Sequence, residues 1–511
     1  MKFKNIIYKG FAAGALLLAT SCSEDFLETT PDRYLDEETI QEAVQADPSK
    51  VQAYVTGAYM DFYCGGDYWT SHDDFGIPAI KLATDFFCED IAYHRDIHWF
   101  CYDYQLDNRL GNYRRVKSTW NQLYSIIDKT NSIITMLKPT DGSEPTDDAK
   151  IKLGEAYSLR AYSYFWLINL WQHPYSVSTN APGVPLKTET EYRQERVSVG
   201  EIYKQILDDI DAGYNYLSGQ GFHNGKIGLS EYAAAAIYAN VLMFTGDYEN
   251  AAKYAGFATQ GGSLNSHEDM LSGFNSLSMP EVIWGYNVTT ETTGYYASLF
   301  SHIDPYMIGY GGGVGCRKLV SSALYDAIAD TDIRKQWFGY NEAYNKAVSV
   351  DFSYEAGYGF EKYIQNKYRD SYVCGTGEPF TSAIIYFRTG EMYFVAAEAY
   401  YLAGKEKEAL DMLNTVMKTR DDSYAFAGSG QALYDEICIQ KRIETFMEGN
   451  RYLDAKRRNE TIDRSTSVNH AADLSYFNAI TYSARDYRFI YRIPTTEMEN
   501  NPSITADDDN E

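Results

Sequence analysis

Adjacent carboxylates are the first residues of this sequence that could do chemistry. Asp73 and Asp74 stand side by side, and two facing carboxyl groups can serve as acid and base in glycoside hydrolysis. Neighbouring side chains need not face one another, and a chain with 71 acidic residues contains many accidental pairs. We therefore expect no catalytic residue and do not interpret the chain as an enzyme.

Two histidines have a spacing that could hold a metal ion. His94 and His98 are four residues apart with Asp96 between them, which would place both rings on one face of a helix. No third histidine and no HExxH motif accompanies them, and the segment has the composition of a loop. We predict no metal site and no cofactor; structural calcium stays open, although no motif supports it.

Charged residues near the C-terminus follow helical spacing. Glu444, Glu448 and Arg451 stand at i, i+4 and i+7, which predicts one charged stripe on a helix. Neighbouring arginines stabilise the ionised form of a carboxylate, whereas a general acid must keep its proton until it donates it. We expect scaffold ion pairs there.

The sequence contains no motif for nucleotide binding or for thiol chemistry. The glycine-rich run 309–315 lacks the GK[ST] of a phosphate loop and has no strand before it, so we expect a flexible loop. Six cysteines besides Cys22 form no CxxC pair, which excludes a zinc ribbon or a thioredoxin-like motif. The sequence leaves open whether they pair; they are Cys64, Cys88, Cys101, Cys316, Cys374 and Cys438.

The charge balance excludes two classes of partner. The 511 residues include 45 basic and 71 acidic side chains, a net charge of −26. Such a chain lacks the positive field that nucleic acids and anionic lipid surfaces require. Tyrosine is abundant, with 47 residues against 24 Phe and 7 Trp, and its apolar face with a polar tip suits surfaces for polar ligands as well as wet helix packing.

The first residues form a sorting signal. Lys2, Lys4 and Lys9 precede the apolar run 11–19, which is too short to span a bilayer. The small residues before Cys22 resemble a bacterial lipobox, which implies a signal peptide over 1–21, cleavage before Cys22 and diacylation of its thiol. An ordinary secretory signal with a chance cysteine is the alternative.

An acidic segment follows the expected anchor. Ser23-Glu24-Asp25 resembles the surface-export signal of Bacteroidetes lipoproteins, which implies an outer-membrane lipoprotein that faces the cell exterior. We predict that 22–48 is an acidic tether and that 49–511 is a single domain.

Helical periodicity dominates the rest of the chain. Residues 112–137 and 149–171 carry apolar residues at i, i+3 and i+4. A further helix is expected over 198–217, with Ser198 and Glu201 forming a capping box.

Two later segments share the same helix–turn–helix pattern. Residues 235–258 and 393–416 each place a glycine, Gly246 or Gly404, between two helical stretches that carry small residues. They resemble tetratricopeptide helix pairs. The fold class we predict is therefore mainly all-α, a tetratricopeptide-like scaffold. Its helical repeats are expected over about 49–62, 112–259 and 383–457.

Two segments interrupt the scaffold. Residues 63–111 and 260–382 lack a sustained helical period and are rich in aromatic residues and turn formers. Long inserts of this kind are usually functional, and recognition normally lies on loops held by a rigid scaffold. We expect the ligand-binding surface there.

The order of these elements resembles the SusD/RagB family of outer-membrane nutrient-binding lipoproteins over about the whole mature chain. The signature near residues 442–454 is similar, as are the helices containing Leu159-Arg160-Ala161 and Trp120. Gln440 and Lys441 depart from the usual Glu-Arg, which would weaken one salt bridge. The scaffold motif residues are Arg160, Arg442, Glu444, Glu448, Gly449, Arg451 and Asp454.

The resemblance implies binding without catalysis. Members capture a nutrient at the cell surface and act as a hinged lid on a SusC-like TonB-dependent β-barrel transporter that imports it. Most bind glycans, and a RagB-like branch binds oligopeptides. Glycan is the ligand we favour on family frequency alone; a glycoside hydrolase or a pure interaction scaffold are further alternatives.

The resemblance also suggests which side chains touch the ligand. Sugar rings stack their C–H faces on aromatic rings, while their hydroxyls bond to polar side chains. The predicted contacts are Tyr93, His98, Trp99, Tyr295, Tyr296, Tyr306, Tyr310 and Arg317, with Tyr68, Trp69 and Asp73 as a third group.

Overall fold

A computed structural model describes residues 50–64, 71–92, 98–139, 143–470 and 480–510. The chain divides into two units, Met1–Gln52 and Ala53–Glu511, and the pockets and clusters discussed below lie in the second. The predicted signal peptide, the lipid anchor at Cys22 and the whole predicted tether lie outside the described residues. No described helix is long and apolar enough to cross a membrane.

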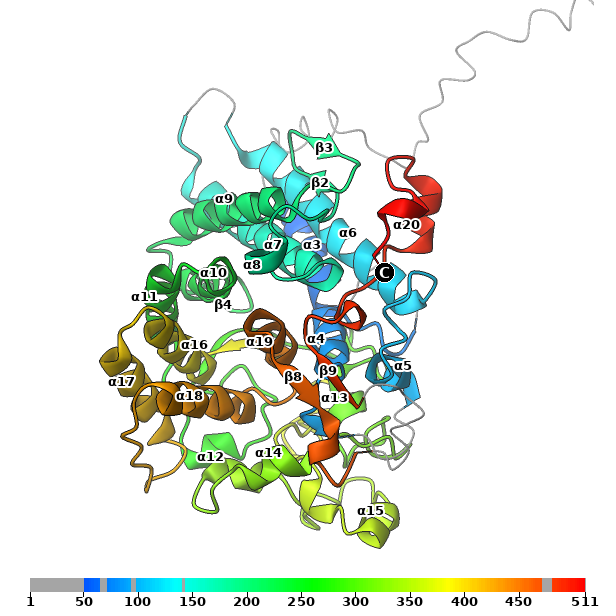
Figure 1. Ribbon diagram of the computed structural model, residues 1–511, viewed down its shortest axis with the longest axis vertical. Helices are drawn as coiled ribbons and strands as arrows, with labels where there is room; N and C mark the ends of the chain where they lie inside the picture. Colours follow the sequence, from blue (N-terminus) through cyan, green and yellow to red (C-terminus); the bar gives the residue numbers. More distant parts are fainter. Residues whose placement is uncertain (1–49, 65–70, 93–97, 140–142, 471–479, 511) are drawn as a thin grey trace, which may run out of the picture. The chain divides into compact units, whose positions relative to one another are not determined.

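Helices make up most of the described chain, as predicted (Figure 1). The longer ones are α3 (Val51–Cys64), α4 (Ile77–Asp85), α6 (Arg114–Leu137), α7 (Asp147–Trp171), α9 (Val199–Leu217), α10 (Glu231–Thr245), α11 (Tyr248–Ala258), α16 (Thr389–Leu402), α17 (Glu406–Met417), α18 (Gln431–Glu444) and α19 (Asn450–Arg458).

Short helices and strands fill the connections. The short helices are α5 (Cys101–Tyr104), α8 (Tyr175–Ser178), α12 (His267–Met270), α13 (Leu299–Ile303), α14 (Ser322–Asp326), α15 (Ser353–Tyr358) and α20 (Thr495–Asn500). The strands are β1 (Ile91–Ala92), β2 (Leu186–Lys187), β3 (Tyr192–Arg193), β4 (His223–Lys226), β5 (Val282–Tyr286), β6 (Leu319–Val320), β7 (Ile384–Arg388), β8 (Thr461–Asp463) and β9 (Thr481–Ser483).

The long helices pack against one another in chain order. α6 contacts α7, α7 contacts α9, α10 contacts α11, and α16 contacts α17. Figure 1 shows α9, α10, α11, α16, α17 and α18 following one another along one side. The scaffold of successive helix pairs is thereby confirmed.

Local sequence explains where these helices begin and end. Ser198 accepts a hydrogen bond from the Glu201 amide, and the Glu201 side chain returns one to the Ser198 amide, so the predicted capping box starts α9. Gly246 ends α10 at φ 85°, and Gly404 follows α16 at φ 75°. This left-handed conformation favours glycine, so both predicted turns are confirmed.

The central insert leaves the scaffold and returns to it at one place. α11 packs directly against α16, although 259–388 separates them in the chain. β5, which follows α12 in the first part of this segment, and β7, which ends it, pair antiparallel, with Val282 opposite Arg388 and Tyr286 opposite Ile384. Between them the longest helix is α15 with six residues, as predicted from the absence of a sustained helical periodicity in this segment.

The first insert contains a helix that the sequence did not reveal. α4 follows Gly76, carries Pro78 in its first turn, and every one of its nine residues is buried. Its polar residues Lys81, Thr84 and Asp85 are buried together with its apolar ones, and nine residues make only about 2.5 turns, too few to establish a helical period. Our prediction of a loop-rich segment over 63–111 is corrected at this helix.

A two-residue strand pair joins the two inserts. Ile91 of β1 lies opposite Val320 of β6, and Ala92 lies opposite Leu319. The Ser321 amide extends this contact by donating to the Asp90 carbonyl at 2.8 Å. β1 of the first insert is therefore held against β6 of the central insert.

The charged stripe near the C-terminus is not one helix. α18 ends at Glu444 and α19 starts at Asn450, with Met447 at φ 63° and Gly449 at φ 78° between them. Two left-handed residues cannot continue an α-helix, so the predicted single stripe is wrong. The ion pairs expected from these charges are nonetheless present.

Glu444 lies fully buried among arginines. Its carboxylate accepts hydrogen bonds from Arg388 at 2.9 Å, from Arg420 at 2.9 Å and from Arg334 at 3.3 Å. Burial alone would raise the pKa of Glu444, but these arginines hold it well below its usual value. Glu448 bonds Arg388 at 2.7 Å and Lys367 at 2.6 Å.

Other motif residues fix the inserts to the scaffold. Glu89 of the first insert pairs with Arg442 at 2.8 Å and with Arg451 at 2.7 Å. Lys441, which departs from the family pattern, still pairs with Asp454 at 2.8 Å. The scaffold motif therefore holds the insert layer in place.

A similar pair lies within the helical scaffold. The Arg160 guanidinium donates to both oxygens of Asp209, at 2.8 and 2.6 Å. Arg160 lies on α7 and Asp209 on α9, so this bidentate pair joins two neighbouring helices.

Candidate ligand-binding site

Five aromatic rings from the two inserts gather in one cluster, here called the aromatic cluster. The His98 ring lies 5.3 Å from Trp99 and 5.3 Å from Tyr310, measured between centroids. Tyr296 lies 6.0 Å from Tyr310, and the His72 ring stacks on Tyr296 at 6.3 Å. The loops predicted to bind ligand therefore converge.

A buried layer holds the aromatic cluster from beneath. The ring of Tyr310 stacks on His302 with centroids 4.7 Å apart, and its hydroxyl hydrogen-bonds Nδ1 of His72 at 2.6 Å. Nε2 of His302 donates to the His72 carbonyl at 2.8 Å. Because burial lowers the pKa of His302 well below its ordinary value, this ring is neutral and serves as a fixed support.

The glycine-rich run is closely packed rather than loose. A Cβ on Gly309 would meet Ser301 Oγ at 2.4 Å, and one on Gly312 would meet the Met307 carbonyl at 2.0 Å. The Gly311 amide donates to the Ser301 carbonyl at 2.7 Å. Glycine is needed here for close backbone approach, and the turn fixes Tyr310, where the sequence suggested a flexible loop.

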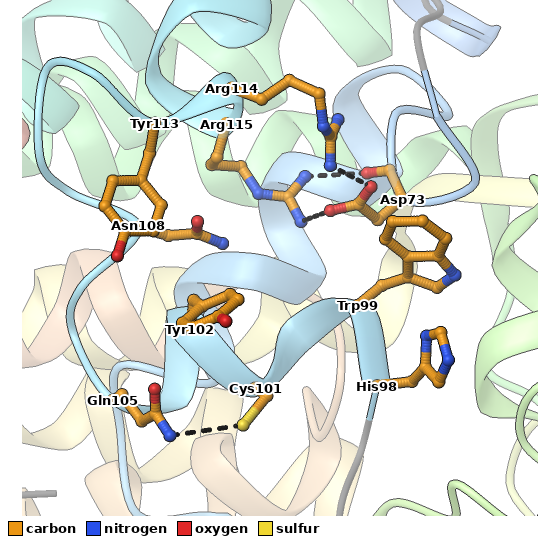
Figure 2. A pocket seen from close by; sticks show the side chains of 10 residues that line it. All are labelled: Asp73, His98, Trp99, Cys101, Tyr102, Gln105, Asn108, Tyr113, Arg114 and Arg115. Atoms are coloured by element: carbon orange, nitrogen blue, oxygen red, sulfur yellow. Dashed lines mark hydrogen bonds and ion pairs between the residues drawn. The ribbon is translucent and has the colours of Figure 1, made fainter.

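A pocket of about 560 Å³ adjoins the aromatic cluster and shares His98 and Trp99 with it (Figure 2). Its remaining lining comes from Asp73 before α4, from α5 and the turn after it, and from the start of α6. These residues are Asp73, Cys101, Tyr102, Gln105, Asn108, Tyr113, Arg114 and Arg115. Tyr102 is half exposed and meets the Tyr113 ring edge-on at 5.7 Å, so further aromatic surface is available there.

Ion pairs make one wall of the pocket rigid. Figure 2 shows Arg114 and Arg115 paired with Asp73, with Arg115 at 2.7 Å. Arg115 also donates to Asp103 at 3.2 Å, and Arg114 also pairs with Asp74. Both oxygens of Asp73 are held by arginines. Burial raises the pKa of Asp103 to about 6, against the opposing effect of Arg115. These carboxylates position the arginines and the start of α6.

Several predicted contact residues take part in this arrangement. His98, Trp99, Tyr296 and Tyr310 belong to the aromatic cluster, and Asp73 lines the pocket. Tyr295 is 59% exposed beside them. Contact of each with a ligand stays a prediction.

The structure corrects two of the predicted contacts. Tyr306 is fully buried, and its hydroxyl donates to Asn366 at 2.8 Å. Arg317 is 2% exposed, pairs with Glu355 at 2.9 Å and lies 4.0 Å above the ring of Phe352. Neither side chain offers surface to a ligand; both are core residues of the insert.

The remaining predicted positions lie outside the described residues. They are Cys22, Tyr68, Trp69 and Tyr93. His94 of the histidine pair lies outside them as well.

Some residues of the arrangement were not predicted. His72 directly precedes Asp73, which was itself predicted as a ligand contact, so its position in the chain could have identified it. Phe380 lies 5.9 Å from Tyr296 and 6.4 Å from Tyr295, yet it is far away in the chain and no local pattern links it to them.

Two family models match this chain, one in its first half and one in its second half. Residues 25–243 match the family model described as "Starch-binding associating with outer membrane", and residues 283–508 match the model of the SusD family. The SusD-like protein P38 of Formosa agariphila is 22% identical over 396 residues, which cover 68% of this chain and 74% of that protein.

Solved structures show the same fold. A SusD-like carbohydrate binding protein from Bacteroides vulgatus has a TM-score of 0.76 at 18% identity, covering 90% of this chain and 97% of that one. A SusD superfamily protein from Bacteroides thetaiotaomicron has a TM-score of 0.74 at 21% identity, covering 91% and 99%.

Proposed function

The chain belongs to the SusD family, and from this premise we propose that it captures an oligo- or polysaccharide at the cell surface. It passes the glycan to a partner SusC-like TonB-dependent β-barrel transporter, on which it acts as a lid. The Bacteroides vulgatus structure of the same fold is described as a carbohydrate binding protein, which supports this proposal.

One observation carries the assignment of the site. Two inserts that are far apart in the chain place His98 and Trp99 against Tyr310, which in turn contacts Tyr296, at the edge of a pocket. Ring faces of this kind stack on the C–H faces of sugars. Gln105 and Asn108 line the same pocket and supply amides for hydroxyl groups.

The pocket binds without catalysing a reaction in this proposal. Its carboxylate Asp73 accepts hydrogen bonds from Arg114 and Arg115 through both oxygens. The carboxylate is therefore engaged in ion pairs that position the two arginines. The arrangement favours a preformed binding surface.

The location follows from the N-terminal sequence. Cys22, behind the apolar run 11–19, carries the lipid and anchors the protein to the outer membrane. The acidic residues directly after it direct the protein to the outer face, where polymers too large to diffuse through the membrane can be captured.

Affinity electrophoresis tests the function. The intact protein is run through native gels that contain single polysaccharides, alongside Tyr296→Ala and the control Tyr358→Ala. Tyr358 is 62% exposed on α15, outside the aromatic cluster. We expect at least one polysaccharide to retard the wild type and Tyr358→Ala, and retardation to be lost in Tyr296→Ala.

Two results would count against this function. Equal retardation of all three proteins would remove the aromatic cluster as the site. Retention of oligopeptides, with no response to any polysaccharide, would transfer the protein to the peptide-binding role.

A further inference from the structure

One face of α6 connects the first pocket with a second one. Arg114 lines the first pocket, and Asn121, Ser125 and Asp128 follow it by seven, eleven and fourteen positions. At 3.6 residues per turn, these spacings return to the same face. Arg114 and Asn121 are then about 10 Å apart along the axis, and exposed Lys117 lies between them.

The second pocket has a volume of about 320 Å³. It lies between α6, the hairpin formed by β2 and β3, and α20. Its lining residues are Trp120, Asn121, Tyr124, Ser125, Asp128, Pro185, Lys187, Tyr192 and Glu497.

Aromatic residues form part of its wall. The rings of Trp120 and Tyr124 lie 4.9 Å apart, and the Tyr124 hydroxyl donates to the Pro185 carbonyl at 2.8 Å. Tyr192 on the hairpin is 53% exposed. The pocket therefore combines a fixed, mostly buried pair with one accessible ring.

Its polar groups are partly fixed and partly available. Nζ of Lys187 pairs with Asp128 at 2.7 Å and lies 5.2 Å from the centre of the Tyr192 ring. Glu497 accepts from Asn501 at 2.9 Å. Among the residues that the structure describes, none hydrogen-bonds the side-chain amide of Asn121, so this amide is available to a ligand.

The charge of the second pocket restricts the ligand. Asp128 and Glu497 outnumber Lys187, the one basic residue of the lining. A lining with excess negative charge repels polyanions. Ring, amide and hydroxyl groups suit a neutral polyhydroxylated chain, which is the chemistry of the first pocket as well.

We propose that the second pocket is a further subsite for the same glycan chain, which runs along the exposed face of α6 from the aromatic cluster to Tyr192. The ligand is then a neutral oligosaccharide long enough to touch both pockets. This inference rests on the proposed function, because it takes the first pocket to bind glycan.

Chain-length dependence tests the proposal. The probes are oligosaccharides of graded length, made by partial acid hydrolysis of the neutral polysaccharide that the intact protein retains. Affinities are measured calorimetrically for the wild type, Tyr192→Ala and Tyr358→Ala. We expect the wild type to bind long chains more tightly than short ones. Tyr192→Ala should bind long chains roughly tenfold more weakly and short chains unchanged, and Tyr358→Ala should match the wild type.

Other outcomes overturn the second subsite. Wild-type affinity independent of length, or a long-chain affinity unchanged in Tyr192→Ala, would show that the ligand does not reach it. Tyr296→Ala separates the two proposals. If that variant loses all binding while Tyr192→Ala loses none, the proposed function stands and the subsite falls. If neither variant changes any affinity, both proposals fail.

Discussion

Residues of one type have different roles in this chain according to their burial. Tyr296 is 39% exposed in the aromatic cluster, whereas Tyr306, ten residues later, is fully buried and hydrogen-bonded to Asn366. Both were predicted as ligand contacts, because the residues next to a tyrosine in the sequence do not show whether its side chain is buried. The same limit applies to Arg317, whose partner Glu355 is distant in the chain.

The two tyrosines should therefore respond differently to truncation. We expect Tyr306→Ala to lower the free energy of unfolding by about 3–5 kcal/mol, the usual cost of removing a large buried aromatic ring. Tyr296→Ala should leave it within about 0.5 kcal/mol of the wild type and weaken ligand binding. Urea denaturation of both variants checks this; similar losses would place Tyr296 in the core.

A second residue prediction concerns Glu444. Glu444→Gln removes the negative charge that Arg388, Arg420 and Arg334 share. Glu281 and Asp332 still pair with these arginines, but one buried positive charge is then in excess, so we expect a loss of about 3 kcal/mol. The exposed pair of Lys407 and Asp411 is the control, and Asp411→Asn should cost less than about 1 kcal/mol. Equal losses would contradict the account.

The pH dependence of Glu444 has a definite sign. Its folded-state pKa lies well below the ordinary value, so its stabilisation is complete above the unfolded-state pKa of about 4.3. The contribution decreases as pH falls below that value. We expect the stability difference between wild type and Glu444→Gln to shrink from pH 6 toward pH 3; a constant difference would contradict this linkage.

At the scale of elements, sequence reasoning succeeded where the signal was local. The capping box of α9 and the glycines at the ends of α10 and α16 lie within a few residues of the boundaries that they define. α4 was missed because it has only nine residues and its start carries Gly76 and Pro78, which are typical of a turn. The convergence of the inserts depends on the pairing of Ile91 with Val320, which no local pattern could reveal; the family resemblance indicated the loops but not their geometry.

The turn between α18 and α19 yields a prediction for an element. Gly449 has φ 78°, its amide donates to Asp85 at 2.9 Å, and an added Cβ would meet Lys81 Cβ at 2.6 Å. Gly404 has a similar φ of 75°, with nothing within 4 Å of an added Cβ. The two glycines therefore share a backbone conformation and differ in packing.

Alanine at each glycine separates the two effects. We expect Gly404→Ala to lower the free energy of unfolding by about 1–2 kcal/mol, the cost of a left-handed non-glycine residue. Gly449→Ala should cost clearly more, because α4 must also move. Thermal denaturation measures the difference; equal losses would show that α4 does not press on this turn.

At the scale of the whole molecule, the helical scaffold carries an insert layer whose two segments meet at one site. Glu89 with Arg442 and Arg451 joins the first insert to α18 and α19. The proposed binding surface is therefore preformed, and the proposed ligand capture would require little ordering of the protein.

Lid behaviour is the prediction at this scale. A ligand shifts an equilibrium only by preferring one of its states. If glycan bridges the lid and the barrel, we expect it to slow dissociation of the protein from its transporter. Single-molecule fluorescence on the complex in lipid nanodiscs measures the opening rate; equal rates with and without glycan would contradict the lid role.

The most direct test of glycan capture is native mass spectrometry of the protein gently extracted from its own outer membrane. Our account predicts a complex with a β-barrel partner that carries ligand masses in regular sugar-unit increments. A broad spread of peptide masses, or a protein with neither partner nor ligand, would contradict it.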